Sequence, residues 1–501
     1  MAILRYSYGK STLAIACFIV FLIALNRISE RTLHSPSFKI PSLNSPYHLA
    51  HANWSDFVGG GVSDSSIPGF ARHHEACKYF PDTSNVLVVV KTGATESYTR
   101  IPIQLLTTLR CLPDFLMFSD MEQDIAGYHI YDSLDDVVPE VMNGNKEFNL
   151  YRRQKACVVD QQSCISNGNL GGGFDGWILD KYKNVHIAEK TYKLRPDYDW
   201  YLFIDADTYV LWNNLAQWLH ELKSLPKEER YYIGSVALTN DFRFAHGGSG
   251  YILSQSTMRE FVGNNSGVAN QYDMKAKESC CGDVVLALAL NETIGLGVKY
   301  AWPTINGENP YTIPYSSREW CHPLVTMHHM NTEEVSSFWR FEKQFYESNE
   351  TSYPTLRFKD IYHEFVAPKL KSKRNDWDNM SDDVVYLDPN RGERFLPWQR
   401  ERDRLKKLQY QLHVPDIEMN AYKSFEDCGK LCKSVNNCFQ FTYHAGACIY
   451  SRSFKLGKPT MKTDKEEDRW ISGWEVERIQ KWVEEQGQCG DPVWPDLQQD
   501  F

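Results

Sequence analysis

The fold follows from one stretch of the sequence, Asp199-Trp200-Tyr201-Leu202-Phe203-Ile204-Asp205-Ala206-Asp207-Thr208-Tyr209-Val210. Its first half is an unbroken apolar and aromatic run, which is typical of a buried strand in an α/β sheet. The run ends at Asp205 and Asp207, whose side chains point to the same side if the chain stays extended. Ligands of open α/β sheets bind outside the carboxyl ends of the strands, so both acids are expected to face that crevice.

Asp205 and Asp207 are therefore candidate metal ligands. Two hard oxygen ligands can hold Mg²⁺ or Mn²⁺ and still leave positions for phosphate oxygens and water. An enzyme needs such a site to bind a nucleoside diphosphate and to neutralise it as it departs. The alternative is that the two acids end the strand in a solvated turn, because Asp-x-Asp is common by chance.

The composition is that of a folded protein with more than one unit. A chain of 501 residues is too long for one compact core. Its hydrophobic and charged fractions, 42% and 24%, are ordinary, and its net charge is -10. No basic patch with interleaved aromatic residues occurs, so the sequence predicts no nucleic-acid partner.

The N-terminus predicts a membrane anchor. Residues 12–26 form an almost continuous apolar segment with basic residues on both sides, so the positive-inside rule does not fix its orientation. Its length suits a signal anchor in a thin early-secretory bilayer, with residues 1–11 cytoplasmic and the body lumenal. A cleaved signal peptide is the alternative. The polar residues 31–74 are expected to form a stem, or else an irregular packed extension.

Two further features favour the lumen of the Golgi apparatus or endoplasmic reticulum. One cysteine, Cys17, lies in the apolar segment, which leaves an even dozen for disulfides in an oxidising compartment. No cysteine or histidine spacing is typical of a zinc site. Acceptor triplets for N-glycosylation begin at Asn53, Asn264, Asn291, Asn349 and Asn379.

The first folded unit is expected to span residues 75–412 and to begin with a parallel crossover. A strand over Asn85–Val90, a helix over Ile101–Leu112 and a strand over Phe115–Ser119 have the order of a Rossmann-like half. Neither a dinucleotide fingerprint nor a P-loop follows the first strand. A long helix is predicted over Trp177–Leu194, with its lysines solvated: Lys181, Lys183 and Lys190.

Three later segments carry polar groups that chemistry can use. Glycines between Phe244 and Ser254 permit close backbone approach to a diphosphate or sugar, although a plain turn uses the same residues. Asp283 precedes an apolar helix, as an N-terminal cap or as a general base. His328 and His329 follow a short apolar run and offer a third metal ligand or a structural imidazole.

Taken in order, these motifs resemble the Fringe and core-1 β1,3-galactosyltransferase group, in particular its fungal type II membrane relatives. The motifs are Leu-Phe-Ile-Asp-Ala-Asp-Thr-Tyr-Val, Gly-Gly-Ser-Gly-Tyr-Ile-Leu-Ser, Cys-Gly-Asp and Leu-Val-Thr-Met-His-His, and the resemblance covers roughly Asn85 to Met330. Two departures are Asp-Ala-Asp in place of three consecutive acids, and a Cys-Cys doublet before Gly-Asp.

The resemblance implies an inverting transferase of GT-A fold with a UDP-sugar donor and Mn²⁺ or Mg²⁺. It implies metal binding by Asp205, Asp207 and His328, with His329 as the alternative histidine, and Asp283 as the base. The donor sugar is expected to be galactose or a related hexose, transferred in β1,3 linkage to a glycan or glycoprotein. The implied donor-binding residues are Lys91, Thr92, Asp120, Ala206, Gly248 and Ser249.

The expected chemistry is a single displacement. The metal stabilises charge on the leaving UDP, and Asp283 takes the proton from the attacking acceptor hydroxyl. Because water must be excluded, a mobile loop within Val262–Glu278 is expected to close over the donor. Alternatives are a non-catalytic lectin-like or scaffold protein and, less favoured because a second metal cluster is missing, a phosphohydrolase.

The region between the two units shows no chemistry. A helix is predicted over Ser336–Tyr346, a charged loop over Lys369–Asp383 and a solvated helix over Arg400–Gln411.

A small second unit is predicted over residues 414–475, followed by a tail over 476–501 with a helix at Val476–Glu485. Ser424 opens a helix that carries Cys428 and Cys432 on one face, and two short strands follow. The cysteine spacing resembles the PAN/apple module, an α+β fold, which implies the disulfides Cys428–Cys448 and Cys432–Cys438. Such a module binds an acceptor or only supports the catalytic domain. The partner of Cys489 is open.

Overall fold

The computed structural model describes residues 75–166, 174–222, 229–349, 354–388 and 415–497. These residues lie in one compact unit, Ser65–Phe501. The predicted cytoplasmic tail, signal anchor and stem lie outside the described residues, as do Asn53 and the helix predicted over Arg400–Gln411. In the part of the chain that is described, every helix is too short or too polar to cross a bilayer.

The larger part of the described chain is built on an eight-stranded mixed sheet whose central strands are parallel. The strand predicted from the apolar run is β5 (Trp200–Asp205), and it pairs in parallel with β1 (Val86–Lys91). The full strand order is β11 (Lys299–Tyr300), β7 (Tyr232–Gly234), β10 (Tyr251–Ser254), β5, β1, β2 (Phe115–Ser119), β4 (Tyr128–Asp132) and β3 (Gln123–Ile125).

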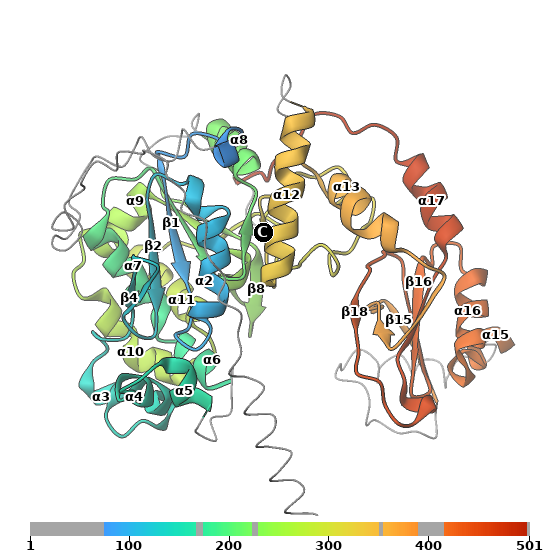
Figure 1. Cartoon of the computed structure of the whole chain (residues 1–501), viewed down its shortest axis with the longest axis horizontal. Helices are drawn as coiled ribbons and strands as arrows, with labels where there is room; N and C mark the ends of the chain where they lie inside the picture. The colour runs from blue at the N-terminus through green and yellow to red at the C-terminus, as the bar shows by residue number, and fades with distance from the viewer. Residues whose placement is uncertain (1–74, 167–173, 223–228, 350–353, 389–414, 498–501) are drawn as a thin grey trace, which may run out of the picture. The chain divides into compact units, whose positions relative to one another are not determined.

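Helices cover both faces of this sheet (Figure 1). On one face, alternate strand residues such as Val89 and Phe203 pack against α7 (Lys183–Leu194), α10 (Val268–Glu278) and α11 (Gly282–Ile294). On the other face, residues such as Val90 and Ile204 pack against α2 (Ser97–Leu106) and α8 (Trp212–Leu222). Burial on both sides explains why the strands read as continuous apolar runs, and the predicted α/β class is confirmed.

This part also contains several short elements. They are α3 (Pro139–Met142), α4 (Asn149–Lys155), α5 (Gln161–Ser166), α6 (Phe174–Asp180), β8 (Val236–Thr239), β9 (Phe242–Ala245) and α9 (Gln255–Met258). The helix predicted over Ile101–Leu112 is shorter than expected, because α2 ends at Leu106 and a separate turn covers Leu109–Cys111.

The long helix predicted over Trp177–Leu194 is two helices, α6 and α7, with a break at Lys181 and Tyr182. The prediction that its lysines are solvated is wrong. Lys181 and Lys183 are buried, and Lys190 is mostly covered. Each ammonium has acidic or carbonyl partners, which compensate for the loss of water.

The mobile loop predicted within Val262–Glu278 is mainly a helix. α10 begins at Val268 and buries Ala269 and Tyr272 in the core that covers the sheet. Because these side chains anchor α10 in the core, the helix is an ordered part of the domain, and the prediction of a mobile loop is wrong.

A third core joins the sheet to the rest of the chain. The helix predicted over Ser336–Tyr346 is confirmed as α12 (Thr332–Ser348), which Asn331 and Glu334 cap reciprocally. It packs with α13 (Phe358–Ile361) and with aromatic residues from distant segments, among them Trp320, Phe454 and Trp474.

The C-terminal part is a five-stranded antiparallel sheet with one helix, α16 (Phe425–Ser434), packed against it. The strand order is β13 (Lys373–Asn375), β19 (Ile471–Trp474), β16 (Gln440–His444), β17 (Ala447–Ser451) and β15 (Val384–Leu387). Since β13 and β15 precede residue 412, the predicted boundary cuts through this sheet, and Lys369–Asp383 is not simply a loop. Short elements complete it: β14 (Trp377–Asp378), α15 (Asp416–Met419), β18 (Lys458–Pro459) and α17 (Val476–Glu485).

The described cysteines form six disulfides. The pairs are Cys77–Cys111, Cys157–Cys164, Cys280–Cys281, Cys321–Cys489, Cys428–Cys448 and Cys432–Cys438. The last two join the residues that the PAN/apple resemblance implied. Cys489, whose partner the sequence left open, links the tail to Cys321, which precedes β12 in the sequence.

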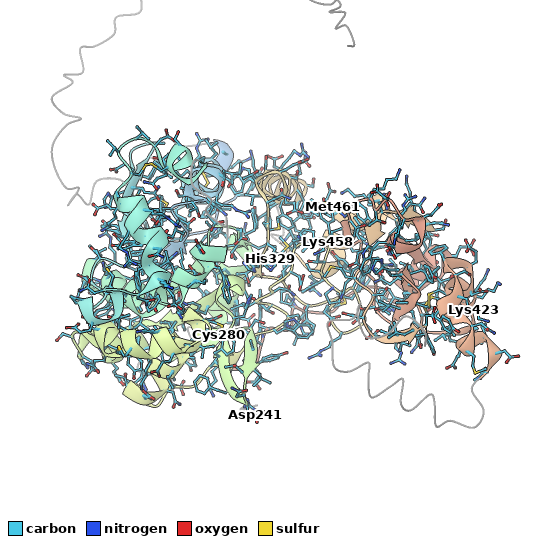
Figure 2. All side chains as sticks on the ribbon, turned by 90° about the horizontal axis from the view of Figure 1, so that it is seen from below. Asp241, Cys280, His329, Lys423, Lys458 and Met461 are labelled. Carbon is cyan, nitrogen blue, oxygen red and sulfur yellow. A yellow bond between two sulfur atoms is a disulfide. The ribbon has the colours of Figure 1, made fainter. Side chains whose placement is uncertain are left out.

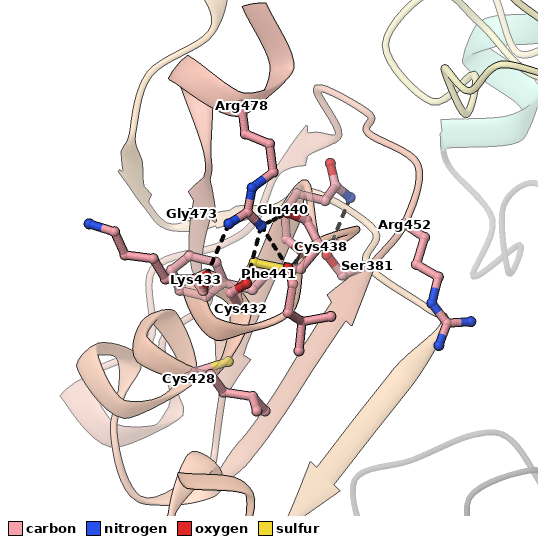
Figure 3. Close-up of a disulfide and its surroundings, with 12 residues drawn as sticks. Ser381, Cys428, Cys432, Lys433, Cys438, Gln440, Phe441, Arg452, Gly473 and Arg478 are labelled. Atoms are coloured by element: carbon pink, nitrogen blue, oxygen red, sulfur yellow. Dashed lines mark hydrogen bonds between the residues drawn. A yellow bond between two sulfur atoms is a disulfide. The ribbon is translucent and has the colours of Figure 1, made fainter. Parts of the chain in front are cut away.

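Arg478 of α17 binds the loop that the Cys432–Cys438 disulfide closes at the end of α16 (Figure 3). Its guanidinium donates to the carbonyls of Cys432, Val435 and Cys438 at 3.3, 2.8 and 2.6 Å, and to that of Lys433 at 3.0 Å. The last carbonyls of a helix lack partners within the helix, so this arginine satisfies them from outside.

Asn379 is not a glycosylation site in this fold. Its side chain is fully buried, and its amide donates to the carbonyls of Phe441 and Gly473 at 3.0 and 3.2 Å. A glycan on this nitrogen would have to displace both bonds and the surrounding sheet. Asn264 and Asn291 are exposed, and Asn349 is half-buried, so their modification remains a prediction.

Candidate functional site

A two-residue strand pair brings the distant histidines to Asp207. β5 ends at Asp205, and after a turn the chain enters β6 (Tyr209–Val210), which pairs antiparallel with β12 (Thr326–Met327). The backbone N–H of Met330 donates to the carbonyl of Asp207 at 2.9 Å. The segment after β12 is thereby fixed against the turn that carries Asp207.

Asp207, His328 and His329 form a candidate metal centre. His328 Nε2 lies 3.2 Å from Asp207 Oδ1, and ligand atoms of the three residues lie within 4.8 Å of one another. The exposed side chain of His329 lies on the loop after β12 (Figure 2). Its backbone φ of 58° is left-handed, a conformation that a non-glycine residue adopts at a cost and that often marks a functional position.

Gly248 makes room for the imidazole of His328. A Cβ on Gly248 would lie 2.2 Å from the His328 ring, so no other residue fits without displacing it. The hydroxyl of Thr208 donates to the carbonyl of Gly248 at 2.7 Å and fixes the loop. The glycines predicted to lie near the ligand therefore cradle a metal-ligand candidate.

The donor set fits a divalent cation. His328 Nδ1 is buried and has no hydrogen-bond partner among the described residues. A carboxylate with one or two imidazoles is a common ligand set for first-row divalent metals, including Mn²⁺. Burial raises the pKa of Asp207, but the hydrogen bond from His328 and the nearby Arg100 outweigh it and hold the pKa below its usual value. The carboxylate is thus kept ionised.

Asp205 has a different partner from Asp207. In the register of the parallel strands, Asp205 lies beside Lys91, whose Nζ is 3.3 Å from its Oδ1. Burial raises the pKa of Asp205, and the Lys91 charge opposes that shift. Within the described residues the ligand group contains Asp207 but not Asp205, so the two acids that the sequence predicted to act together have separate contacts.

Asp180 is an acid of the site that the sequence did not predict. It ends α6, and its carboxylate contacts Lys91 Nζ at 2.5 Å and Lys183 Nζ at 2.9 Å. A cavity beside it is lined by Lys91, Asp205, Gly247 and other residues of the sheet edge and α7. Only a single acid marks this position in the sequence, which is too weak a signal to single it out.

Asp283 lies in the first turn of α11 and faces the glycine loop. Its Oδ2 accepts from the N–H of Gly247 at 3.1 Å, and its Oδ1 accepts from the N–H of Val284 at 2.9 Å. The neighbouring His246 ring lies 5.6 Å from that of His328. The cap position of α11 is Cys281 and Asp283 lies within the first turn, so the prediction of an N-terminal cap at Asp283 is wrong, and its role as a base stays a prediction.

Four of the other predicted donor-binding residues are buried: Thr92, Asp120, Ala206 and Ser249. Asp120 accepts from the N–H of Ala94 at 2.5 Å, and the carbonyl of Thr92 accepts from Lys183 at 3.1 Å. As placed, Asp120 supports the loop after β1 and is not exposed to a ligand.

Together, the mixed sheet, the acids at its carboxyl edge and the carboxylate–imidazole cluster fit a GT-A-like domain. Residues 82–301 match the protein family described as Fringe-like, which is a GT-A glycosyltransferase-like family. The match supports a glycosyltransferase, and it includes Lys91, Asp180, Asp205, Asp207 and Asp283 but ends before His328. A comparison with curated proteins finds no match for the chain.

Proposed function

We propose that the chain is an inverting glycosyltransferase that requires Mn²⁺ or Mg²⁺ and transfers a hexose from a UDP-sugar. The expected product is a glycan or glycoprotein that carries galactose or a related sugar in β1,3 linkage. The cluster of Asp207, His328 and His329 beside the glycine loop is the observation that carries the proposal. The Fringe-like match supports it independently, because the matched residues include Asp207 of this cluster as well as Lys91 and Asp283.

The side chains divide the chemistry between them. Asp207, His328 and His329 would hold the cation, which when bound supplies Lewis-acid stabilisation to the departing diphosphate. Lys91 offers a positive charge to the same diphosphate. Asp283, oriented by the N–H of Gly247, takes the proton from an acceptor hydroxyl as it attacks the anomeric carbon from the opposite face. A single displacement of this kind inverts the configuration.

The proposal extends to the location and the C-terminal part. The lumen of the Golgi apparatus or endoplasmic reticulum suits six disulfides, and residues 12–26 would anchor the chain as a type II protein. The C-terminal sheet, with its PAN/apple-like cysteine pattern, would bind the acceptor or support the catalytic domain. A non-catalytic, lectin-like protein is the second candidate, although such a protein has no need to keep Asp283 in place.

A panel of UDP-sugars tests the proposal. The full chain is incubated with each UDP-sugar, Mn²⁺ and a set of glycan acceptors, and the product linkage is read by NMR. We expect one UDP-hexose to give a β-linked product, and chelation of the metal to abolish it. Binding of UDP without transfer to any acceptor would favour the lectin-like alternative.

A further inference from the structure

Asp180 belongs to a row of alternating charges at the carboxyl edge of the sheet. Lys183, Asp180, Lys91 and Asp205 follow one another with separations of 2.9, 2.5 and 3.3 Å. Both lysines are largely buried, with side-chain exposures of 1% for Lys183 and 14% for Lys91. Opposite charges in so little water interact strongly, and each ammonium depends on its acidic partners.

Asp180 links two segments of the site that are far apart in sequence. Through Lys91 it holds the end of β1, and through Lys183 it reaches the loop after that strand, because Lys183 also donates to the carbonyl of Thr92 at 3.1 Å. The backbone of Asp180 also packs closely on Gly282, since a Cβ on that glycine would lie 2.5 Å from the Asp180 carbonyl oxygen. The end of α6 is thus fixed between the loop after β1 and α11, the helix that carries Asp283.

The direction of the Lys91 ammonium depends on Asp180. Burial lowers the pKa of Lys91, but Asp180 and Asp205 outweigh it and keep the amine charged. Asp283 also acts on this charge. Without Asp180, the ammonium would be drawn towards Asp205 and Asp283, away from α6 and into the cavity that Asp205 and Gly247 line.

We propose that Asp180 is a positioning residue of the donor site, which holds the Lys91 ammonium at the carboxyl end of β1 for contact with the diphosphate of the nucleotide-sugar. The proposal rests on the proposed function for the identity of the ligand. The pairing of Asp180 with Lys91 is itself a property of the fold and can be tested without a donor.

The first experiment measures the reactivity of Lys91. The full chain is treated with acetic anhydride, and acetylation of Lys91 is followed by mass spectrometry of its peptide. Asp180→Asn should raise the rate at Lys91 at least threefold. Asp175→Asn is the matched control, because Asp175 lies on the same helix and pairs with Arg153 at 3.3 Å. An unchanged rate in Asp180→Asn would overturn the proposal.

The second experiment measures UDP affinity by calorimetry in the presence of Mn²⁺. We expect Asp180→Asn and Lys91→Met each to weaken binding about tenfold or more, Asp180→Glu to recover most of the loss, and Asp175→Asn to bind within twofold of wild type. The double variant Asp180→Asn/Lys91→Met should bind no more weakly than Lys91→Met alone. Fully additive losses, or normal binding by Asp180→Asn, would overturn the proposal.

The two measurements separate the possible failures. If the wild-type chain binds no UDP with Mn²⁺, the proposed function fails, while the acetylation rate still decides whether Asp180 holds Lys91. If the wild type binds UDP and Asp180→Asn labels and binds like wild type, the proposed function stands and the role of Asp180 is lost.

Discussion

The two sheets of this protein use polar residues in opposite ways. The eight-stranded sheet ends in Asp205 and Lys91, which line a cavity, and His328 Nδ1 has no hydrogen-bond partner among the described residues. The C-terminal sheet surrounds Asn379 with partners: its amide donates to two carbonyls, and its carbonyl accepts from Ser381 and Thr442. Completed networks specify a structure, whereas polar groups left with capacity at a cleft point to a ligand.

The largest effect is expected from a substitution at the metal centre. Asp207→Ala should lower kcat/KM for the UDP-sugar by about 10³-fold or more, because the cluster loses its only carboxylate ligand. Turnover with saturating Mn²⁺ measures the loss. Asn379→Ala is the control: it should lower the melting temperature and leave kcat/KM nearly unchanged. An active Asp207→Ala variant would remove the metal role from this acid.

The next effect separates binding from chemistry. Asp283→Asn should lower kcat by about 10²- to 10⁴-fold, the usual contribution of a general base, because an amide cannot take the acceptor proton. UDP affinity should stay near that of wild type, because the Gly247 N–H can still donate a hydrogen bond to the oxygen of the asparagine side chain. Transfer at the normal rate would require another base.

The part of the site that the sequence predicts is the part carried by a single element. The apolar run of β5 fixes the sheet edge, so Asp205 and Asp207 follow directly from it. The approach of His328 depends on β6 and β12, two strands of two residues each, whose local signal is negligible. The residues alone offered His328 and His329 as a metal ligand or a structural imidazole, and the resemblance to Fringe-like enzymes favoured His328 as the ligand.

Where the sequence failed, long-range contacts decided the outcome. Lys183 was expected in solvent because lysines usually lie there, but Asp180 and the carbonyl of Thr92 stabilise it in the core. The strand β13 is Lys-Arg-Asn, which has no strand pattern of its own, and only its pairing with β19 reveals it. The strand β15 is Val-Val-Tyr-Leu, which suits a strand, but its pairing with β17 across the predicted boundary is a long-range contact.

A third prediction concerns a buried acid, Glu342, that forms no ion pair with another described residue. Glu342 accepts from the Tyr209 hydroxyl at 2.6 Å, and burial raises its pKa to about 7 from 4.5. A carboxyl group with a raised folded-state pKa stabilises the fold at low pH, so the free energy of unfolding should fall by about 3 kcal/mol between pH 4.5 and 7. The Glu342 charge in turn raises the pKa of the neighbouring Tyr346 hydroxyl, after burial as the larger cause.

Glu342→Gln should remove that part of the pH dependence. Urea unfolding at pH 5 and pH 8 measures it, and the difference between the two pH values should shrink by about 3 kcal/mol relative to wild type. Glu347→Gln, on the exposed face of the same helix, is the matched control and should behave as wild type. An unchanged pH dependence in Glu342→Gln would show that this carboxyl group is ionised in the folded state.

The smallest effect is expected from a substitution in the C-terminal part of the chain. Arg478→Ala removes the charged donor from four carbonyls at the end of α16 and just after it, and should lower the free energy of unfolding by about 2 kcal/mol. Arg452→Ala, on the exposed side of the same part, is the control (Figure 3). Transfer activity should be unchanged in both. A loss of activity in Arg478→Ala alone would link this part of the chain to catalysis.

A calorimetric titration of UDP into the full chain, with and without Mn²⁺, decides whether a cation joins this protein to a nucleotide. We predict that Mn²⁺ tightens UDP binding at least tenfold in wild type and has no effect on it in Asp207→Ala. Equal UDP affinity with and without Mn²⁺ in the wild-type chain would contradict the metal centre and, with it, the proposed transferase mechanism.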